Sequence, residues 1–444
     1  MVSPTSIPFV SIADDDTGAT DLGDMIAQKG VRTVIFIDLP TPQALAEYTS
    51  DAQAVIVATR SRSIDPAEAR RKVTDAIECL KPLQPRICQI KICATFDSTE
   101  KGNIGPSADA AMNVLGVDFI PVVAALPVNG RTTYMGYQFV GDQLLSDSPM
   151  KDHPLNPMHQ PSLVKWLGRQ TRRKVGLANL DRVRQGPAHL KHRLQELARD
   201  GHGMAIIDAI EQSDLAVIAE AIEDMPLLVG SSGIGGELAD RLCTCSPRTM
   251  QNIAPDGLEG GVLVVSGSCS KRTQEQNRYA QEHGFLTARV EAAELLSDKA
   301  EARSHIESIS ADVVDRLAAG ANVLVYSSGD DAHVADVQSL GRTKGLSVEQ
   351  VGLAVSNALT SIAVAAVRKA KLRKLVVAGG ETAGQVCRGL GVAALEVGGR
   401  IDPGVPWCVA KGKTQLAVVL KSGGFGSEDF FPKAAGQLDA LGGR

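Results

Sequence analysis

The stretch FVSIADDDTGATD at residues 9–21 decides the fold. Its first five residues are mostly apolar or β-branched, as in a buried strand, and three aspartates separate them from a helical pattern. The same rhythm of strand-sized runs and helical patterns continues. The runs are TVIFI at 33–37, AVIVAT at 54–59 and CQIKIC at 88–93, and the helical patterns lie near 20–29, 66–82 and 107–115. Because parallel strands need crossover helices, this rhythm predicts a doubly wound α/β domain that binds ligands beyond the carboxyl ends of its strands.

A second series of strand-sized runs begins at GVLVVSGS, residues 261–268. It continues through LTARV at 286–290, NVLVYSSG at 322–329, KLVVAGGE at 374–381, AALEV at 393–397 and QLAVVLKSGG at 415–424, with helical patterns at about 302–319 and 348–370. Residues 243–261 mix proline, glycine and polar residues without periodicity, as an interdomain linker does. The sequence therefore predicts two doubly wound α/β domains, at 1–245 and 255–444, with the boundary near 250.

Composition argues against nucleic-acid-binding, membrane and secreted proteins. With 46 basic and 51 acidic residues the 444-residue chain carries a formal net charge of −5, which would not draw a nucleic-acid backbone. Its longest apolar runs are strand-sized, so no membrane segment is predicted. The N-terminus lacks a secretory pattern, and the eight cysteines are scattered without a paired CxxC, which favours reduced thiols in the cytoplasm. The basic cluster at 169–174 is interpreted as a solvated surface.

Three adjacent carboxylates follow the first predicted strand. Asp14, Asp15 and Asp16 repel one another, which is tolerable where substrate hydroxyls or a cation share them, or where one accepts a proton. The competing interpretation is an N-cap for the helix that follows, since aspartate and threonine both cap well. The residues alone leave the two interpretations equal.

Polar side chains also follow the third, fourth and fifth predicted strands. Arginine binds carboxylates through two parallel hydrogen bonds, and Asp, Ser and Asn read sugar hydroxyls, so these loops suit a small polyhydroxy acid. A hydrophilic surface loop is the alternative for each. The candidate catalytic residues are Asp16, Asp97 and Lys101, and the candidate substrate-binding residues are Asp15, Arg60, Ser98, Asn103 and Arg131.

Three glycine- and serine-rich loops follow predicted strands in the second series. Small residues there leave backbone N–H groups exposed to an anion, and a helix N-terminus favours phosphate. Each loop alone could be a tight turn, but three in one domain converge on one nucleotide. Neither a Walker A loop nor a GxGxxG fingerprint is present. The candidate nucleotide-binding residues are Ser266, Gly267, Ser268, Gly379, Gly380, Glu381, Thr382, Lys421, Gly423 and Gly424.

These motifs resemble the four-carbon acid sugar kinase family along nearly the whole chain. The residues that carry the resemblance are ADDDTGATD at 13–21, ATRSRS at 58–63, FDSTEKGNIGP at 96–106, LPVNGRTTYMGYQFV at 126–140, NP at 156–157, VSGSCS at 265–270, VAGGETAG at 377–384, DPGVPW at 402–407 and LKSGGFG at 420–426. The resemblance implies an N-terminal sugar-acid-binding domain and a C-terminal ATP-binding domain. It implies ATP and Mg²⁺, without naming the metal ligands, and leaves room for a homodimer.

Two details place the chain within that family. Many threonate and erythronate kinases carry STLRG where residues 98–102 read STEKG, and this variant looks like the branch that acts on 3-oxo-tetronate. The resemblance therefore implies phosphorylation of 3-oxo-tetronate at its C4 hydroxyl. The alternatives are a kinase for D-threonate, L-threonate or D-erythronate, and a non-catalytic sugar-acid sensor. The second detail is Gly424, where the family motif usually has asparagine, so that a side-chain amide near the nucleotide is missing.

Overall fold

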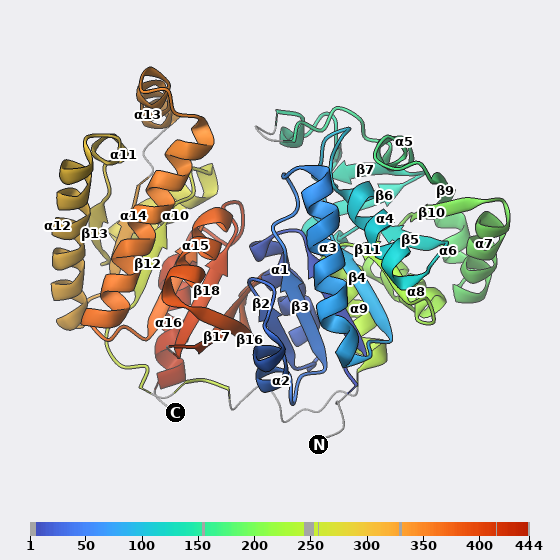
Figure 1. Cartoon of the computed structure of the whole chain (residues 1–444), viewed down its shortest axis with the longest axis horizontal. Coiled ribbons are helices and arrows are strands. Elements are labelled where there is room, and N and C mark those ends of the chain that lie inside the picture. The colour runs from blue at the N-terminus through green and yellow to red at the C-terminus, as the bar shows by residue number, and fades with distance from the viewer. Residues whose placement is uncertain are drawn as a thin grey trace. The chain divides into compact units, whose positions relative to one another are not determined.

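The computed structural model describes residues 6–152, 156–243, 253–255, 257–327, 331–413 and 415–442 (Figure 1). Contacts divide the chain into two compact units, Met1–Thr249 and Met250–Arg444, and each contains a sheet with helices on both faces. The prediction of two doubly wound α/β domains is thereby confirmed. The predicted boundary near 250 lies outside the described residues.

The sheet of the first unit is parallel. Its strands follow the order β2-β3-β1-β4-β11-β5-β10-β9. The central strands are buried along their whole length, which explains why they are continuous apolar runs in the sequence. The strands are β1 (Phe9–Ala13), β2 (Thr33–Phe36), β3 (Ala54–Ala58), β4 (Ile87–Lys91), β5 (Ile120–Val123), β9 (Lys174–Ala178), β10 (His202–Ile207) and β11 (Leu227–Gly230).

Helices cover both faces of this sheet, as right-handed crossovers require. On one face α1 (Asp16–Ala27) and α8 (Gln212–Ile222) pack against α9 (Ser232–Leu242), and on the other α3 (Pro66–Leu80) packs against α4 (Ile104–Leu115). The shorter or peripheral helices are α2 (Pro42–Tyr48), α5 (Leu163–Gly168), α6 (Leu180–Arg184) and α7 (Pro187–Arg199). A small antiparallel sheet, which the sequence did not predict, contains β6 (Arg131–Tyr134), β7 (Tyr137–Val140) and β8 (Gln143–Leu144).

The sheet of the second unit is mixed. Its order is β13-β14-β12-β15-β18-β17-β16, parallel from β13 to β18, with β17 antiparallel to both of its neighbours. The sequence analysis missed β17, because its first residues follow a Pro-Gly pair that marks a turn. Gly404, at φ 77°, makes that turn into a hairpin. The strands are β12 (Leu263–Ser266), β13 (Leu286–Arg289), β14 (Val323–Tyr326), β15 (Lys374–Ala378), β16 (Val392–Asp402), β17 (Val405–Gly412) and β18 (Leu416–Lys421).

Two layers of helices enclose this second sheet. α10 (Lys271–Glu282) packs against α16 (Phe430–Gly442), whereas α14 (Val348–Lys369) packs between α12 (Lys299–Ala318) and α15 (Gly380–Leu390) (Figure 1). The remaining helices are α11 (Ala292–Leu295) and α13 (Asp331–Thr343).

The apolar helix α14 bears on the prediction that the chain has no membrane segment. By length and composition alone α14 is long and apolar enough to cross a membrane. Its apolar residues Val351, Leu359 and Ile362 are buried against the second unit, and the helix contacts α12, α15 and β12. These contacts identify α14 as a core helix of the second unit.

The core of the second unit yields a stability prediction. Phe430 is fully buried among side chains of the sheet and of α16. Phe430→Ala should therefore lower the free energy of unfolding by about 3 to 5 kcal/mol, because it removes a large apolar group and leaves a cavity. Urea unfolding followed by circular dichroism would measure the loss. Leu286→Ala is the control, since the side chain of Leu286 is 45% exposed, and equal losses in the two variants would contradict the core assignment.

Candidate functional site

The partly buried Arg62, which follows β3, gathers the carboxylates that follow β1 and β4. Arg62 binds Asp14 through two hydrogen bonds, Nε to Oδ2 at 2.9 Å and Nη2 to Oδ1 at 2.8 Å. Its Nη1 lies 2.5 Å from Asp15 Oδ2 and 3.5 Å from Asp97 Oδ2. One guanidinium therefore contacts three carboxylates from two separate strand ends.

Asparagine side chains fix the loops around this cluster. Asn156 donates to Asp97 Oδ1 at 2.8 Å and to Ser63 Oγ at 3.2 Å. Asn103 donates to the carbonyls of Ser61 and Ile64, both at 2.7 Å. Since Asn103 holds the backbone on both sides of Arg62, it positions the arginine.

Burial and Arg62 set the protonation of the aspartates. Burial raises the pKa of Asp14 above its ordinary value, although Arg62 opposes this. Burial acts on Asp15 too, but Arg62, Lys91 and the backbone N–H of Gly18 together lower the pKa of its carboxyl. The pKa of Arg62 is well above its ordinary value because Asp14 and Asp15 outweigh the cost of its burial. Asp15 and Arg62 are therefore charged at neutral pH.

Lys91 and Asp21 form a second ion pair, which is buried. Lys91 Nζ lies 3.7 Å from Asp21 Oδ2, and Asp21 also accepts a hydrogen bond from Ser232. Burial raises the pKa of Asp21, against the effect of Lys91. A Cβ on Gly18 would lie 2.6 Å from Asp15 Oδ1 and 2.8 Å from Lys91 Nζ, so a larger residue there would displace these charged groups.

Two predicted aspartates begin α1. Asp15 is the N-cap, because its side chain accepts a hydrogen bond from the N–H of Gly18, and Asp16 is buried in the first turn. The N-cap interpretation is therefore confirmed for Asp15, whose side chain also contacts Arg62, and the role of the aspartates toward a ligand stays a prediction.

The other predicted residues of the first unit lie outside the Arg62 contacts. Arg60, at φ 50°, turns away and pairs with Asp38. Arg131 donates to the carbonyl of Asn129, and Lys101 is exposed. Ser98 is buried and hydrogen-bonded within the protein.

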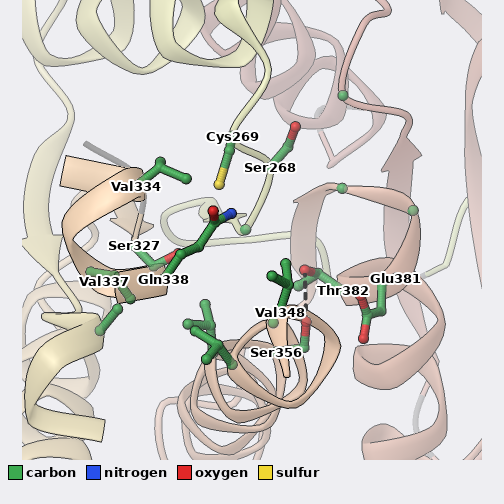
Figure 2. A pocket seen from close by; sticks show the side chains of 18 of the residues that line it. Ser268, Cys269, Ser327, Val334, Val337, Gln338, Val348, Ser356, Glu381 and Thr382 are labelled. Carbon is green, nitrogen blue, oxygen red and sulfur yellow. Dashed lines mark hydrogen bonds between the residues drawn. The ribbon is translucent and has the colours of Figure 1, made fainter. Parts of the chain in front are cut away.

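A pocket in the second unit is lined at one end by the predicted glycine-rich loops (Figure 2). Its volume is about 310 Å³, within the roughly 300–1,000 Å³ typical of small-molecule sites. Of the residues predicted to bind nucleotide, all but Ser266, Lys421 and Gly424 line it. A Cβ on Gly267 would collide with the Thr382 hydroxyl, and a Cβ on Gly423 would collide with the Ser268 hydroxyl. Glycine at these positions therefore lets the three loops pack closely together.

Valines form the opposite wall of this pocket. Val334 and Val337 of α13 face it together with Val348, Val351 and Val355 of α14. This apolar wall suits a flat base, while the N-termini of α10 and α15 suit phosphate groups. The pocket can accommodate a nucleotide in one orientation, with its base on the valines and its phosphates at the glycines.

Lys421 does not line this pocket, but its side chain contacts the loops that do. Its fully buried ammonium donates to Thr273 Oγ1 at 3.1 Å and to the carbonyls of Ser422 and Gly423 at 3.0 and 3.2 Å. Ser270 donates to the same Gly423 carbonyl at 2.6 Å. Burial, with a smaller effect of Arg272, lowers the pKa of Lys421 to about 7. Lys421 thus ties the loop after β18 to the start of α10.

Sequence reasoning missed Arg62, Asn156 and Lys91. Arg62 stands two residues from the chosen Arg60, and the motif gives both the same chemistry, so only backbone direction separates them. Asn156 follows no predicted strand, and Lys91 is a single cation within an apolar strand. Among the described residues no group of three or more His, Cys, Asp or Glu side chains is arranged to hold a metal ion.

Comparison with known proteins also divides the chain into two domains. A family profile described as a sugar-binding N-terminal domain matches residues 9–238, and one described as a nucleotide-binding C-terminal domain matches residues 263–431. A 3-oxo-tetronate kinase of Pseudomonas savastanoi pv. phaseolicola is 40% identical over 96% of both chains. One of Burkholderia multivorans is 39% identical over 99% of both.

Solved structures have the same fold. A Haemophilus influenzae protein of the family DUF1537 has a TM-score of 0.77 and 34% identity, over 97% of this chain and all of its own. A Salmonella typhimurium LT2 structure described as a tRNA synthase has a TM-score of 0.83 and 31% identity, over 96% of this chain and 98% of its own. The full-length identity to named kinases and the two matched domains show that this chain belongs to the four-carbon acid sugar kinase family and is a kinase.

Proposed function

We propose that this kinase transfers the γ-phosphoryl group of ATP to the C4 hydroxyl of 3-oxo-tetronate. The observation that carries the proposal is the near full-length identity to proteins named 3-oxo-tetronate kinase, joined to a polar cluster in one unit and a glycine-lined pocket in the other. The STEKG segment at 98–102 supports the oxidised acid over D-threonate, L-threonate and D-erythronate. A sensor without catalysis is not favoured.

The Arg62 cluster suits hydroxyl groups better than a carboxylate. Three aspartates face a single arginine there, so an incoming carboxylate would be repelled, whereas a hydroxyl can donate to a carboxylate oxygen. We assign Asp15 and Asp97 to the substrate hydroxyls, with Asp97 or Asp16 as the proton acceptor for the C4 oxygen. The substrate carboxylate goes to Arg60 or Arg131, with Lys101 as a further cation.

The nucleotide pocket suits ATP as the phosphoryl donor. The base would pack on the valines of α13 and α14, and the phosphates would accept hydrogen bonds from N–H groups at Gly267, Gly380 and Gly423. Mg²⁺ usually binds through phosphate oxygens with one or two carboxylates, so it would arrive with the nucleotide. Glu381 is the carboxylate of this pocket, and burial raises its pKa.

A cytoplasmic location and a homodimer stay predictions. The first rests on the scattered cysteines. Light scattering of the purified protein would decide the second.

The first test concerns substrate and site together. Asp97→Asn keeps the volume of the side chain and its acceptor for Asn156 but removes the charge next to Arg62. We expect kcat/KM for 3-oxo-tetronate to fall more than tenfold with an unchanged KM for ATP. A lost charged hydrogen bond costs about 2 to 5 kcal/mol, and a tenfold effect needs only about 1.4. Steady-state assays coupled to ADP release measure both constants.

Two further variants sharpen this test. Arg60→Ala should raise KM for the sugar acid with little change in kcat, as loss of uniform binding does. Asp75→Asn makes the same chemical change as Asp97→Asn on the exposed side of α3 and should behave as wild type. Wild-type kinetics in Asp97→Asn would remove the site assignment. A wild-type enzyme that prefers D-threonate would change only the substrate.

The buried Lys421 predicts that ATP binding takes up a proton. With a pKa of about 7 most of this lysine is neutral at pH 8, and bound phosphates nearby should raise its pKa, so binding should draw protons from the buffer. Calorimetric titration with ATP at pH 8, in two buffers of different ionisation enthalpy, measures the uptake. Lys421→Met should abolish it, whereas Lys374→Met, at a buried lysine paired with Asp439, should not.

The same lysine fixes the sign of a stability change. Between pH 7 and about 10.4 the unfolded chain holds a proton that folded Lys421 has released. The contribution of Lys421 to stability should therefore rise with pH across that window, and the rise should be missing in Lys421→Met. In the calorimetric test, ATP-binding enthalpies of the wild type that are equal in both buffers would contradict the depressed pKa of Lys421.

A further inference from the structure

The loop between β4 and α4 carries Asp97 but is not fixed by the Arg62 cluster alone. Phe96, directly before Asp97, has φ 56°, a left-handed conformation that is rare for a bulky side chain. Such a conformation persists only where the surroundings hold it. The contacts of the next residue, Ser98, identify what holds it.

Every hydrogen-bonding position of the Ser98 hydroxyl is used inside the protein. Its Oγ donates to the carbonyl of Phe96 at 2.9 Å and accepts from Trp166 Nε1 at 3.1 Å and from Gln170 Nε2 at 2.9 Å. A hydroxyl has one donor and two acceptor positions, so none remains for a ligand. Ser98 is 1% exposed, Trp166 3% and Gln170 7%.

Gln170 also joins the two ends of this loop. Besides Ser98, its Nε2 donates to the carbonyl of Thr99 at 2.8 Å, and its Oε1 accepts from the N–H of Gly105 at 3.1 Å. A Cβ on Gly105 would lie 2.5 Å from the Gln170 carbonyl oxygen, so α4 can start here only with glycine. One amide group therefore fixes both the start of the loop and its return into α4.

We propose that Trp166 and Gln170, acting through Ser98, are positioning residues of the sugar-acid site. This group of three, called the Ser98 clamp, holds the left-handed turn at Phe96 and so aims Asp97 at Arg62 and Asn156. It replaces the assignment of Ser98 to substrate binding. The proposal rests on the proposed function, because its kinetic consequence is turnover of the sugar acid.

The first test removes single hydrogen bonds of the clamp. Trp166→Phe deletes the indole N–H and keeps an aromatic ring, and Ser98→Ala deletes the shared hydroxyl. We expect each to lower kcat/KM for 3-oxo-tetronate about tenfold or more, with KM for ATP within twofold of wild type. The double variant should be no worse than Ser98→Ala, because both changes break the same interaction.

A second measurement does not depend on turnover. The chain has two tryptophans, so in a Trp407→Phe background selectively excited tryptophan fluorescence comes from Trp166 alone. Binding of 3-oxo-tetronate without ATP should shift or quench that emission. Ser98→Ala in the same background should weaken the sugar-acid affinity read from it at least tenfold. Trp407 packs against Gly398 and Gly399 in the second unit, so Trp407→Phe is also the kinetic control and should leave sugar-acid constants unchanged.

The outcomes separate the clamp from the proposed function. If the wild type phosphorylates 3-oxo-tetronate and Trp166→Phe and Ser98→Ala match it, the clamp is overturned. If the wild type phosphorylates another C4 acid instead, the substrate proposal fails and the same variants judge the clamp with that acid. Reduced turnover together with a lower melting temperature and an equally raised KM for ATP would show a merely structural role and also overturn it.

Discussion

Everything in the N-terminal site depends on one guanidinium being surrounded by carboxylates. Asp14, Asp15 and Asp97 come from strand ends that meet only in the folded sheet, and without Arg62 their charges would be buried close together and uncompensated. The arginine cannot lose its proton, so the protons that remain exchangeable are those of the acids. The same contacts that allow the fold therefore hold three carboxylates around one permanent positive charge.

The pocket of the second unit offers backbone N–H groups to an anion, whereas the cluster of the first unit is built around an arginine side chain. The pocket is built from glycines that bring three loops within backbone contact, so N–H groups are exposed at two helix N-termini. The cation of that region, Lys421, is used to tie the loops together through Thr273 and two carbonyls. A Cβ added at Gly424 would meet nothing within 4 Å, so the loop leaves space for a side chain at this position.

Periodicity predicted the strands β1 to β5 and the helices α1, α3 and α4, because their buried residues form continuous or regularly spaced apolar patterns in the sequence, but it did not predict the short helix α2. It could not predict β17, which begins beside a Pro-Gly turn, or the small sheet of β6, β7 and β8, which has little buried apolar surface. At the site, residue type indicated the loops, but it could not show which arginine contacts the aspartates. Arg60 has a left-handed backbone and pairs with Asp38, whereas Asn103 holds the backbone on both sides of Arg62, which contacts the carboxylates.

Ser98 shows what residue type alone leaves out. A serine beside Asp97 has the chemistry of a substrate ligand, and only its hydrogen bonds show that its donor and acceptor positions are used by Phe96, Trp166 and Gln170. Glu100, one of the two residues by which STEKG differs from STLRG, is on the same loop and pairs with Arg169, whose guanidinium lies 5.9 Å from the centre of the Trp166 ring. The side chain of Glu100 is exposed, so its contacts lead to Trp166 and not to Arg62. The segment that carries the resemblance to this branch is therefore joined to the same residues that hold Ser98.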